Sequence, residues 1–253
     1  MTGNTTSNAT DRSDRRTPLG ARGEFRSALE GLRSSQKPGA GVPAYLRWVN
    51  RWLGRYAAAA ASVIGLTPNA VTAIGAFVSL IGLVLIAVAG GTLGGAIAAA
   101  VLLLVGYALD SADGQLARLT GTGSKAGEWI DHVVDATRLP LTHLAIAIGL
   151  FLRESAPWTI AAALAFLIVD SVWFFAQTLA EKLSGSASLG STAPAWVSFA
   201  KLPYDSAALY FVVATLALLP LFLVLYLSLL VFSFFVALIS LRRKYRMLLA
   251  DPA

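Results

Sequence analysis

Long apolar runs separated by short polar or glycine-rich interruptions fill most of the chain. The first run starts at Thr67-Pro68, where a capping residue precedes a proline suited to the first helical turn, and it ends before Gly90. Most runs have the length that crosses the hydrocarbon layer of a membrane as a helix. The pattern predicts six transmembrane helices within residues 67–241, and the five that follow the first one cover residues 93–109, 126–152, 158–179, 206–219 and 221–241, the fifth span (206–219) being the shortest.

The segment before the first run has a different pattern. Within residues 42–61, aromatic and aliphatic side chains alternate with Arg47, Arg51 and Arg55, which recur every four residues. A four-residue spacing places the arginines on one helical face, and an apolar face opposite a basic face is typical of a helix in the membrane interface. Residues 1–41 are polar, and we predict a mostly disordered basic head with a short helix around Glu24–Arg33.

Composition supports a membrane protein. Hydrophobic residues make up 56% of the chain and charged residues 13%, about half the charged fraction of an ordinary soluble domain, which is about 25%. The chain has no cysteine, which excludes disulfides, zinc–thiolate sites, iron–sulfur clusters and thiol catalysis. We therefore predict an all-α polytopic membrane protein, with residues 42–246 as the membrane domain and residues 247–253 as a short tail.

The distribution of charge predicts the topology. Residues 1–60 carry ten basic and four acidic side chains, residues 241–253 carry four and one, and the region between carries six and nine. Basic segments stay on the cytoplasmic side of a membrane, so we expect both termini in the cytoplasm. Six spans agree with this, because an even number of spans places both termini on the same side. The net charge of +6 then points to anionic lipid as a partner and not to nucleic acid.

Four aspartates stand out within the apolar body. Asp110 and Asp113 end the second span, and Asp131 and Asp135 begin the third. Spacings of three and four residues place each pair on one helical face, and the turn rich in Gly, Thr and Ser between the pairs lets them converge. Four converging carboxylates favour a divalent cation, and their hard oxygen atoms suit Mg²⁺, Mn²⁺ or Ca²⁺ better than Zn²⁺.

Small residues and one arginine accompany these aspartates. Gly114, Ala117 and Gly127 leave room for a ligand, and Arg118 offers a planar fork to phosphate oxygens. Metal, space and a guanidinium suggest a phosphoanhydride ligand, with one carboxylate as the base for an attacking hydroxyl. The simpler alternative is that the acids pair with Arg118, Lys125 or Arg138 in a solvated loop, but it does not explain two same-face pairs of acids beside small residues.

These residues carry a resemblance to a known family. The pattern Asp110-x-x-Asp113-Gly114-x-x-Ala117-Arg118, eight residues, Gly127-x-x-x-Asp131-x-x-x-Asp135 resembles the signature of the CDP-alcohol phosphotransferase family. The resemblance covers about residues 42–246 and implies a membrane enzyme of phospholipid biosynthesis. Such an enzyme transfers a phospho-alcohol unit from a CDP-alcohol, often CDP-diacylglycerol, to a hydroxyl acceptor and releases CMP.

The resemblance also implies roles for single residues. The four aspartates, Asp110, Asp113, Asp131 and Asp135, would hold two Mg²⁺ or Mn²⁺ ions, and Asp135 would activate the acceptor hydroxyl. The CDP site would be lined by Gly114, Ala117 and Gly127, with Arg118 near the phosphates. We expect the site to face the cytoplasm of a bacterial cell membrane, and a homodimer is possible.

Other interpretations stay open at this point. An aspartate-rich membrane prenyltransferase would use similar metal chemistry, and a transporter would use the carboxylates for cation coupling, although no matched pair of broken helices is visible. The sequence does not identify the acceptor. Lys125, Arg138 and Lys201 are candidates for binding a charged acceptor such as a phosphorylated polyol, while Asp170 in the fourth span either faces a polar cavity or bonds to a neighbouring helix.

Overall fold

The computed structural model describes residues 21–34, 36, 39, 41–184 and 194–250, and these residues form helices and turns without any strand. Within this described part of the chain, five helices are long and apolar enough to cross a membrane. They are α3 (Pro68–Ala89), α4 (Leu93–Thr120), α5 (Lys125–Leu152), α6 (Pro157–Leu183) and α9 (Leu219–Leu249). The shorter elements are α1 (Ala21–Ser34), η1 (Leu46–Asn50), α2 (Arg51–Val63), α7 (Ala195–Ala200), η2 (Leu202–Tyr204) and α8 (Ser206–Val213).

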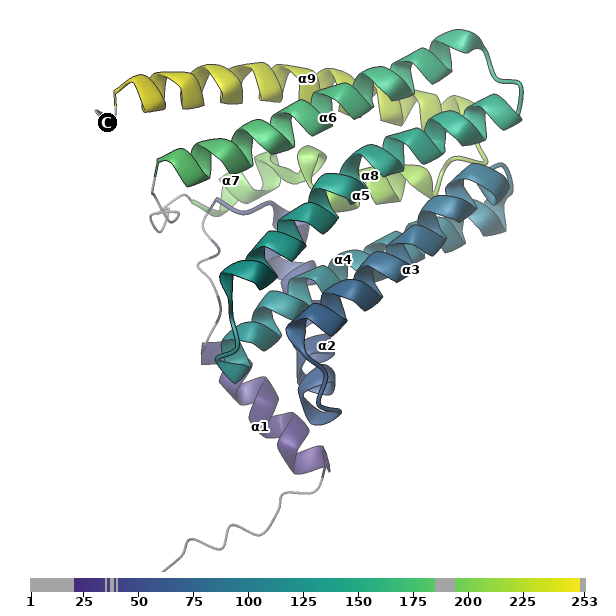
Figure 1. The fold of residues 1–253 in the computed structure, drawn as a ribbon. Coiled ribbons are helices and arrows are strands. Elements are labelled where there is room, and N and C mark those ends of the chain that lie inside the picture. The colour runs from purple at the N-terminus through teal and green to yellow at the C-terminus, as the bar shows by residue number, and fades with distance from the viewer. Residues whose placement is uncertain (1–20, 35, 37–38, 40, 185–193, 251–253) are drawn as a thin grey trace, which may run out of the picture.

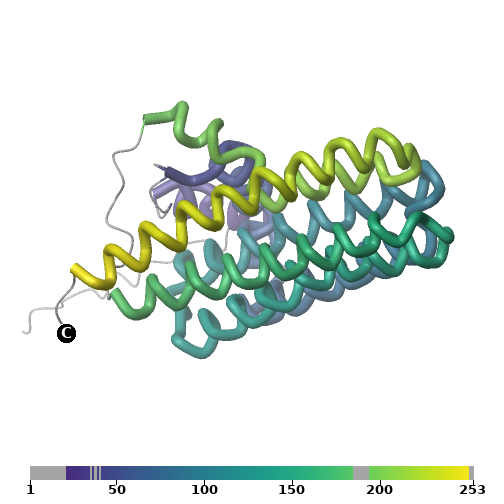
Figure 2. The backbone as a smooth tube through the Cα atoms, turned by 90° about the horizontal axis from the view of Figure 1, so that it is seen from above, coloured from purple at the N-terminus to yellow at the C-terminus, as the bar shows by residue number. Residues whose placement is uncertain are grey.

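The long helices lie side by side in one elongated bundle (Figure 1). The α3–α4 and α5–α6 turns lie at one end of the bundle, while α1, α2, α7 and the α4–α5 turn gather at the other end (Figures 1 and 2). The chain is therefore an all-α polytopic membrane protein, as predicted. The end that carries α1 and α2 is called the site end below.

Local sequence signals define where the helices at the site end begin and stop. Thr67 caps α3 by accepting a hydrogen bond from the Ala70 amide at 3.2 Å, and Ser124 caps α5 by accepting one from the Gly127 amide at 3.0 Å. Helix α4 ends at Gly121, whose φ of 67° is a left-handed conformation that glycine adopts readily. The α4–α5 turn is therefore short and fixed at both sides.

The fifth predicted span has an unusual form. Its helix α8 has only eight residues, too few to cross the hydrocarbon layer as a helix, and turns continue the segment to Leu218. Asp205, which precedes α8, accepts a hydrogen bond from the Leu46 amide near the site end, whereas Leu216 packs against Gly90 at the opposite end. The segment thus runs along the bundle between the long helices, and the count of six membrane spans stays a prediction.

The two segments before α3 are both helical. The predicted interfacial helix consists of η1 and α2, and its Trp48, Trp52 and Tyr56 side chains are exposed, as a helix in the membrane interface requires. The short helix predicted around Glu24–Arg33 in the head is present as α1, which packs Leu32 into a core with α2 and α4. Residues 1–20 of the head and residues 251–253 of the tail lie outside the described residues.

Candidate active site

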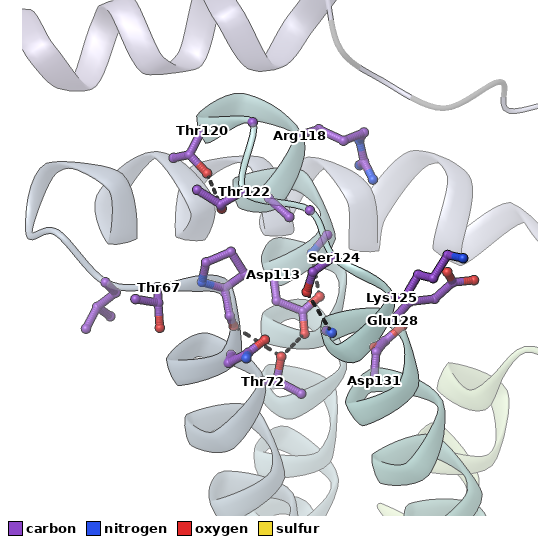
Figure 3. A pocket seen from close by; sticks show the side chains of 18 residues that line it. Thr67, Thr72, Asp113, Arg118, Thr120, Thr122, Ser124, Lys125, Glu128 and Asp131 are labelled. Carbon is purple, nitrogen blue, oxygen red and sulfur yellow. Dashed lines mark hydrogen bonds between the residues drawn. The ribbon is translucent and has the colours of Figure 1, made fainter.

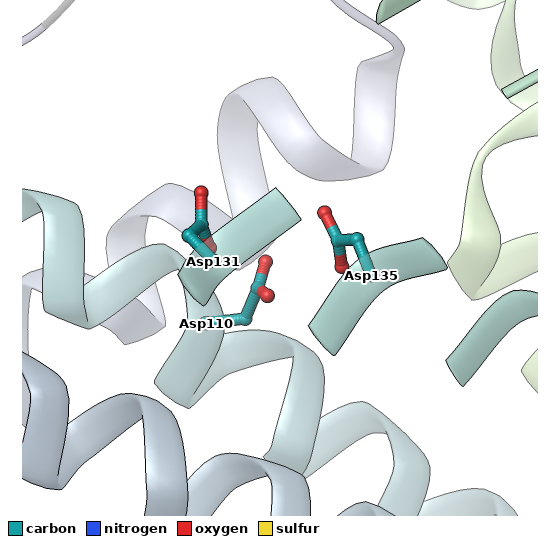
Figure 4. Close-up of side chains that lie close together, drawn as sticks. All are labelled: Asp110, Asp131 and Asp135. Atoms are coloured by element: carbon teal, nitrogen blue, oxygen red, sulfur yellow. The ribbon is translucent and has the colours of Figure 1, made fainter. Parts of the chain in front are cut away.

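Three of the four predicted metal ligands meet where α4 and α5 lie against each other. One carboxylate oxygen from each of Asp110, Asp131 and Asp135 lies within 4.8 Å of the other two, and Figure 4 shows the three side chains together. Asp110 comes from α4 and the other two from the first turns of α5. The hairpin expected from the sequence therefore brings Asp110 to Asp131 and Asp135, and oxygen ligands at this spacing fit a divalent cation.

The fourth aspartate, Asp113, is held apart from this group of three. Its Oδ2 accepts a hydrogen bond of 2.5 Å from the Thr72 hydroxyl of α3, and its Oδ1 accepts one from the Gly114 amide. Only 5% of the residue is exposed. Asp113 and Asp131 nevertheless line the same cleft (Figure 3). Asp113 thus faces this cleft from the place where α4 packs against α3.

Arg138 links two carboxylates of the cluster. Its Nη2 donates a hydrogen bond to Asp135 and lies 3.4 Å from Asp110 Oδ1, while its guanidinium lies over the ring of Tyr107. Asp110 Oδ1 is buried and has no hydrogen-bond partner among the described residues. A buried carboxylate oxygen with this ion pair but no hydrogen bond to the described residues, beside two further carboxylates, is what an oxygen-binding metal ion would satisfy, so the residues present fit the metal that the pattern predicts.

A large cleft opens beside the cluster towards the α4–α5 turn. Its volume is about 840 Å³, and its lining includes Asp113 and Asp131 together with Thr67, Asn69 and Thr72 of α3 and its cap. All the residues predicted for the nucleotide site line it as well, namely Gly114, Ala117, Arg118 and Gly127. Gly127 is tightly placed, because a Cβ there would lie 3.3 Å from Asn69 Oδ1. The cleft therefore has room and polar groups for a nucleotide.

A second cavity lies on the other side of the cluster. Its volume is about 340 Å³, and Asp110, Asp135 and Arg138 line it together with residues of α6, η2, α8 and α9. Asp131 lines the first cleft and Asp135 the second cavity, so the acidic cluster lies where the two meet. Tyr204 and Asp205 belong to this second lining. Burial raises the pKa of Asp205. Burial together with the charge of Asp205 raises the pKa of Tyr204 to about 12.

The basic residues expected to bind a charged acceptor are not brought together. Lys125 lines the first cleft, and Arg138 lines the second cavity, where it is paired with Asp135. Lys201 donates a hydrogen bond of 2.6 Å to the Gly41 carbonyl, and burial together with the charge of Arg243 lowers its pKa. Asp170 lines the second cavity and also bonds to His143, so both expectations for this residue hold.

Sequence reasoning missed Thr72 and most of the second cavity. Thr72 contacts Asp113 across 41 positions of sequence, and no spacing rule predicts such a contact between helices. Trp173 and Tyr204 come from different elements and have no motif of their own. The only sequence signal for this cavity was the presence of acids, Asp170 and Asp205, in otherwise apolar segments.

Comparison with known proteins agrees with this site. A family model described as CDP-alcohol phosphatidyltransferase matches residues 65–239, which is more than half of the chain and includes all four aspartates. A search of curated proteins finds no match.

Proposed function

The chain belongs to the CDP-alcohol phosphatidyltransferase family, whose enzymes transfer a phosphoalcohol unit from a CDP-alcohol to an alcohol, and we propose that this enzyme uses CDP-diacylglycerol in phospholipid biosynthesis. The observation that carries the proposal is the group of three carboxylates between a large cleft and a second cavity. Donor and acceptor then approach the same carboxylates from opposite sides. As an integral membrane enzyme, it would meet a lipid donor within the bilayer.

The first cleft is the proposed donor site. Gly114, Ala117 and Gly127 leave its floor free of bulky side chains, and Arg118 at its wall offers two parallel donors to phosphate oxygens. The volume of about 840 Å³ lies within the range of pockets that hold ligands of nucleotide size. Lys125 at the rim adds a positive charge near the diphosphate.

The acidic cluster is the proposed metal site. Asp110, Asp131 and Asp135 would hold divalent metal, Mg²⁺ or Mn²⁺, with Asp113 as a fourth ligand from the cleft side; two ions are proposed. A bound divalent ion supplies neutralisation of the charge that develops on the phosphoryl oxygens. The buried oxygen of Asp110 that has no hydrogen-bond partner among the described residues supports this assignment.

Asp135 is the proposed base. It lines the second cavity, from which the acceptor hydroxyl would approach, and Arg138 holds its carboxylate in place. The acceptor oxygen forms a bond to the phosphorus that carries the lipid, and its proton passes to Asp135. The anhydride P–O bond breaks, and CMP leaves with the bonding electron pair.

Replacement of the base tests the mechanism. We expect Asp135→Asn to abolish CMP release while metal-dependent CDP binding persists, because the amide keeps the shape of the side chain and cannot accept the proton. The measurement is CMP release from CDP-diacylglycerol with a panel of acceptors, alongside CDP binding by calorimetry. Glu154→Gln, in the exposed turn between α5 and α6, is the control and should behave as the wild type. Near-normal turnover by Asp135→Asn would refute the assignment.

Removal of metal tests the cluster. We expect EDTA to stop CMP release and Mg²⁺ or Mn²⁺ to restore it, since three carboxylates at this spacing need a cation to bind a diphosphate. Full activity in metal-free buffer would contradict the proposal. Absence of CMP as a product would instead favour a prenyltransferase or a transporter. We also propose that the site faces the cytoplasm of a bacterial cell membrane and that the enzyme forms a homodimer.

A further inference from the structure

The second cavity has a lining that differs from that of the first cleft. Aromatic side chains form much of its wall, and acids beyond Asp110 and Asp135 face it from other elements. Arg138 is the one cationic side chain among the described residues of this lining. Besides the cluster and Arg138, the lining includes Phe166, Asp170, Trp173, Phe174, Tyr204 and Asp205.

The single cation of this lining is already paired. Arg138 donates a hydrogen bond to Asp135 and lies 3.4 Å from Asp110, and only 6% of its side chain is exposed. A phosphorylated acceptor would bring further negative charge next to Asp170 and Asp205 without a free cation to balance it. Burying such a charge is unfavourable, so the side chains of the cavity, apart from the metal proposed at the cluster, oppose an anionic acceptor.

Asp170 is fixed at the cavity wall by a buried hydrogen-bond chain. Its Oδ2 lies 3.0 Å from His143 Nε2, and His143 Nδ1 lies 2.7 Å from the Tyr226 hydroxyl. Because an ionised carboxylate only accepts, Nε2 carries the proton and Nδ1 accepts from Tyr226. His143 is fully buried and Tyr226 nearly so, so both position Asp170 without reaching a ligand themselves. One oxygen of Asp170 remains for a bond to a molecule in the cavity.

Trp173 lies three residues after Asp170 on α6, so the two share a helical face. Its indole Nε1 is buried and has no hydrogen-bond partner among the described residues. Its ring stands edge-on to Tyr204, with centroids 5.0 Å apart, which leaves aromatic faces for the cavity. Aromatic faces attract cations, so Trp173 beside the carboxylate of Asp170 suits a cationic group of a ligand.

We propose, resting on the function proposed above, that the second cavity selects an acceptor alcohol that carries an ammonium group and rejects phosphorylated acceptors. Asp170 and Trp173 are the recognition residues for the ammonium end, while the hydroxyl end faces Asp135. In the reaction, the acceptor oxygen bonds to phosphorus and its proton passes to Asp135. The anhydride P–O bond breaks, and CMP leaves. The proposed acceptor with an ammonium group differs from the phosphorylated polyol that Lys125, Arg138 and Lys201 suggest from the sequence.

An acceptor panel tests the selection. Purified full-length protein with Mg²⁺ and CDP-diacylglycerol would receive ethanolamine, choline, glycerol or glycerol 3-phosphate, and CMP release would be measured for each. We expect kcat/KM to be at least about tenfold higher for ethanolamine or choline than for the other two, since the cation gains both a charge partner and an aromatic face. A higher value for glycerol or glycerol 3-phosphate would overturn the inference and leave the proposed function standing. Absence of CMP with all four acceptors would also overturn the inference, while absence of CMP with every acceptor of the wider panel would overturn the proposed function itself.

Two variants test the recognition residues. Asp170→Asn keeps the bond to His143 and removes the charge, and Trp173→Phe removes the N–H and weakens the aromatic face. We expect each to raise KM for the ammonium acceptor about tenfold and to leave metal-dependent CDP binding unchanged. Glu154→Gln and Trp158→Phe, at the opposite end of the bundle, are matched controls with no expected effect. An unchanged KM in both recognition variants, or an equal loss of CDP binding, would overturn the inference.

Discussion

At the scale of single residues, Thr72 sets the position of Asp113. The Thr72 hydroxyl donates to Asp113 and comes from α3, so it ties a third helix to the acidic cluster. We expect Thr72→Val, which keeps the shape and removes the donor, to weaken metal-dependent CDP binding about tenfold, the effect of one lost charge-assisted hydrogen bond of about 1.5 kcal/mol. Titration calorimetry with CDP at several Mg²⁺ concentrations measures this change.

The matched control is Thr137→Val on α5. Thr137 is exposed, and its hydroxyl bonds to the Val133 carbonyl of its own helix. This variant should bind CDP as the wild type does. Equal binding by Thr72→Val and the wild type would show that Asp113 needs no support from α3.

Arg138 is a second residue whose contacts predict how its replacement changes the stability of the protein. Its removal leaves Asp110 and Asp135 without the cation that neutralises them, and breaking a buried ion pair costs about 3–5 kcal/mol. We expect Arg138→Gln to lower the thermal unfolding midpoint in EDTA and to regain part of the loss when Mg²⁺ is added, because a bound cation also neutralises the carboxylates. A midpoint that does not respond to Mg²⁺ in the variant would contradict the metal assignment.

The sequence predicts much of the site at this scale because the motif is local. Spacings within α4 and α5 are enough to place Asp110, Asp131 and Asp135 on facing surfaces, and the structure brings them within 4.8 Å. The position of Asp113 is not predictable in this way, since its partner lies on α3. The second cavity is beyond sequence reasoning for the same reason, because its wall combines α6, η2 and α9.

At the scale of helices, close packing of α3 on α4 positions the cluster. A Cβ on Gly106 would lie 2.0 Å from Ser79 Oγ and 3.0 Å from the Gly75 carbonyl, so the two backbones approach at this point. The same pair of helices carries Thr72 and Asp113. The absence of a side chain at Gly106 is therefore a requirement of the site as well as of the fold.

Enlarging this contact tests the coupling. We expect Gly106→Ala to push α3 from α4, to cost about 1–3 kcal/mol by overpacking and to weaken CDP binding. Gly94→Ala is the control on the same helix, since a Cβ there meets nothing within 4 Å. Thermal unfolding and CDP titration of both variants give the comparison. Wild-type behaviour of Gly106→Ala would show that the packing is looser than the structure has it.

Helix boundaries follow from the sequence where caps are strong. Thr67, Ser124 and Gly121 define three boundaries at the site end, and the apolar runs give the lengths of the long helices. The segment of α8 departs from this rule, because hydrophobicity alone does not reveal that a run is covered by neighbouring helices. Tyr210 and Leu216 are almost completely buried, so this run packs in the interior and has no need of a full-length helix.

At the scale of the whole molecule, the path of the chain determines which side of the membrane holds the termini. If the segment from Ser206 to Leu218 carries the chain across, the C-terminal end of α9 lies on the same side as α1. The structure supports this path, since Asp205 contacts Leu46 and Leu216 packs against Gly90 at the other end. The basic residues at both ends of the chain favour the cytoplasm for that side.

Labelling of single cysteines tests this topology without background, because the chain has no cysteine of its own. We expect Ala156→Cys, in the α5–α6 turn, to react with a membrane-impermeant maleimide in intact cells. The variants Ser34→Cys and Arg246→Cys should react only after the cells are permeabilised, and the wild type should not react at all. Labelling of Arg246→Cys in intact cells, with Ser34→Cys still protected, would mean that the α8 segment does not cross the membrane and ends on the side where it begins. The basic C-terminal end would then lie outside, against the distribution of charge, and the chain would cross the membrane five times.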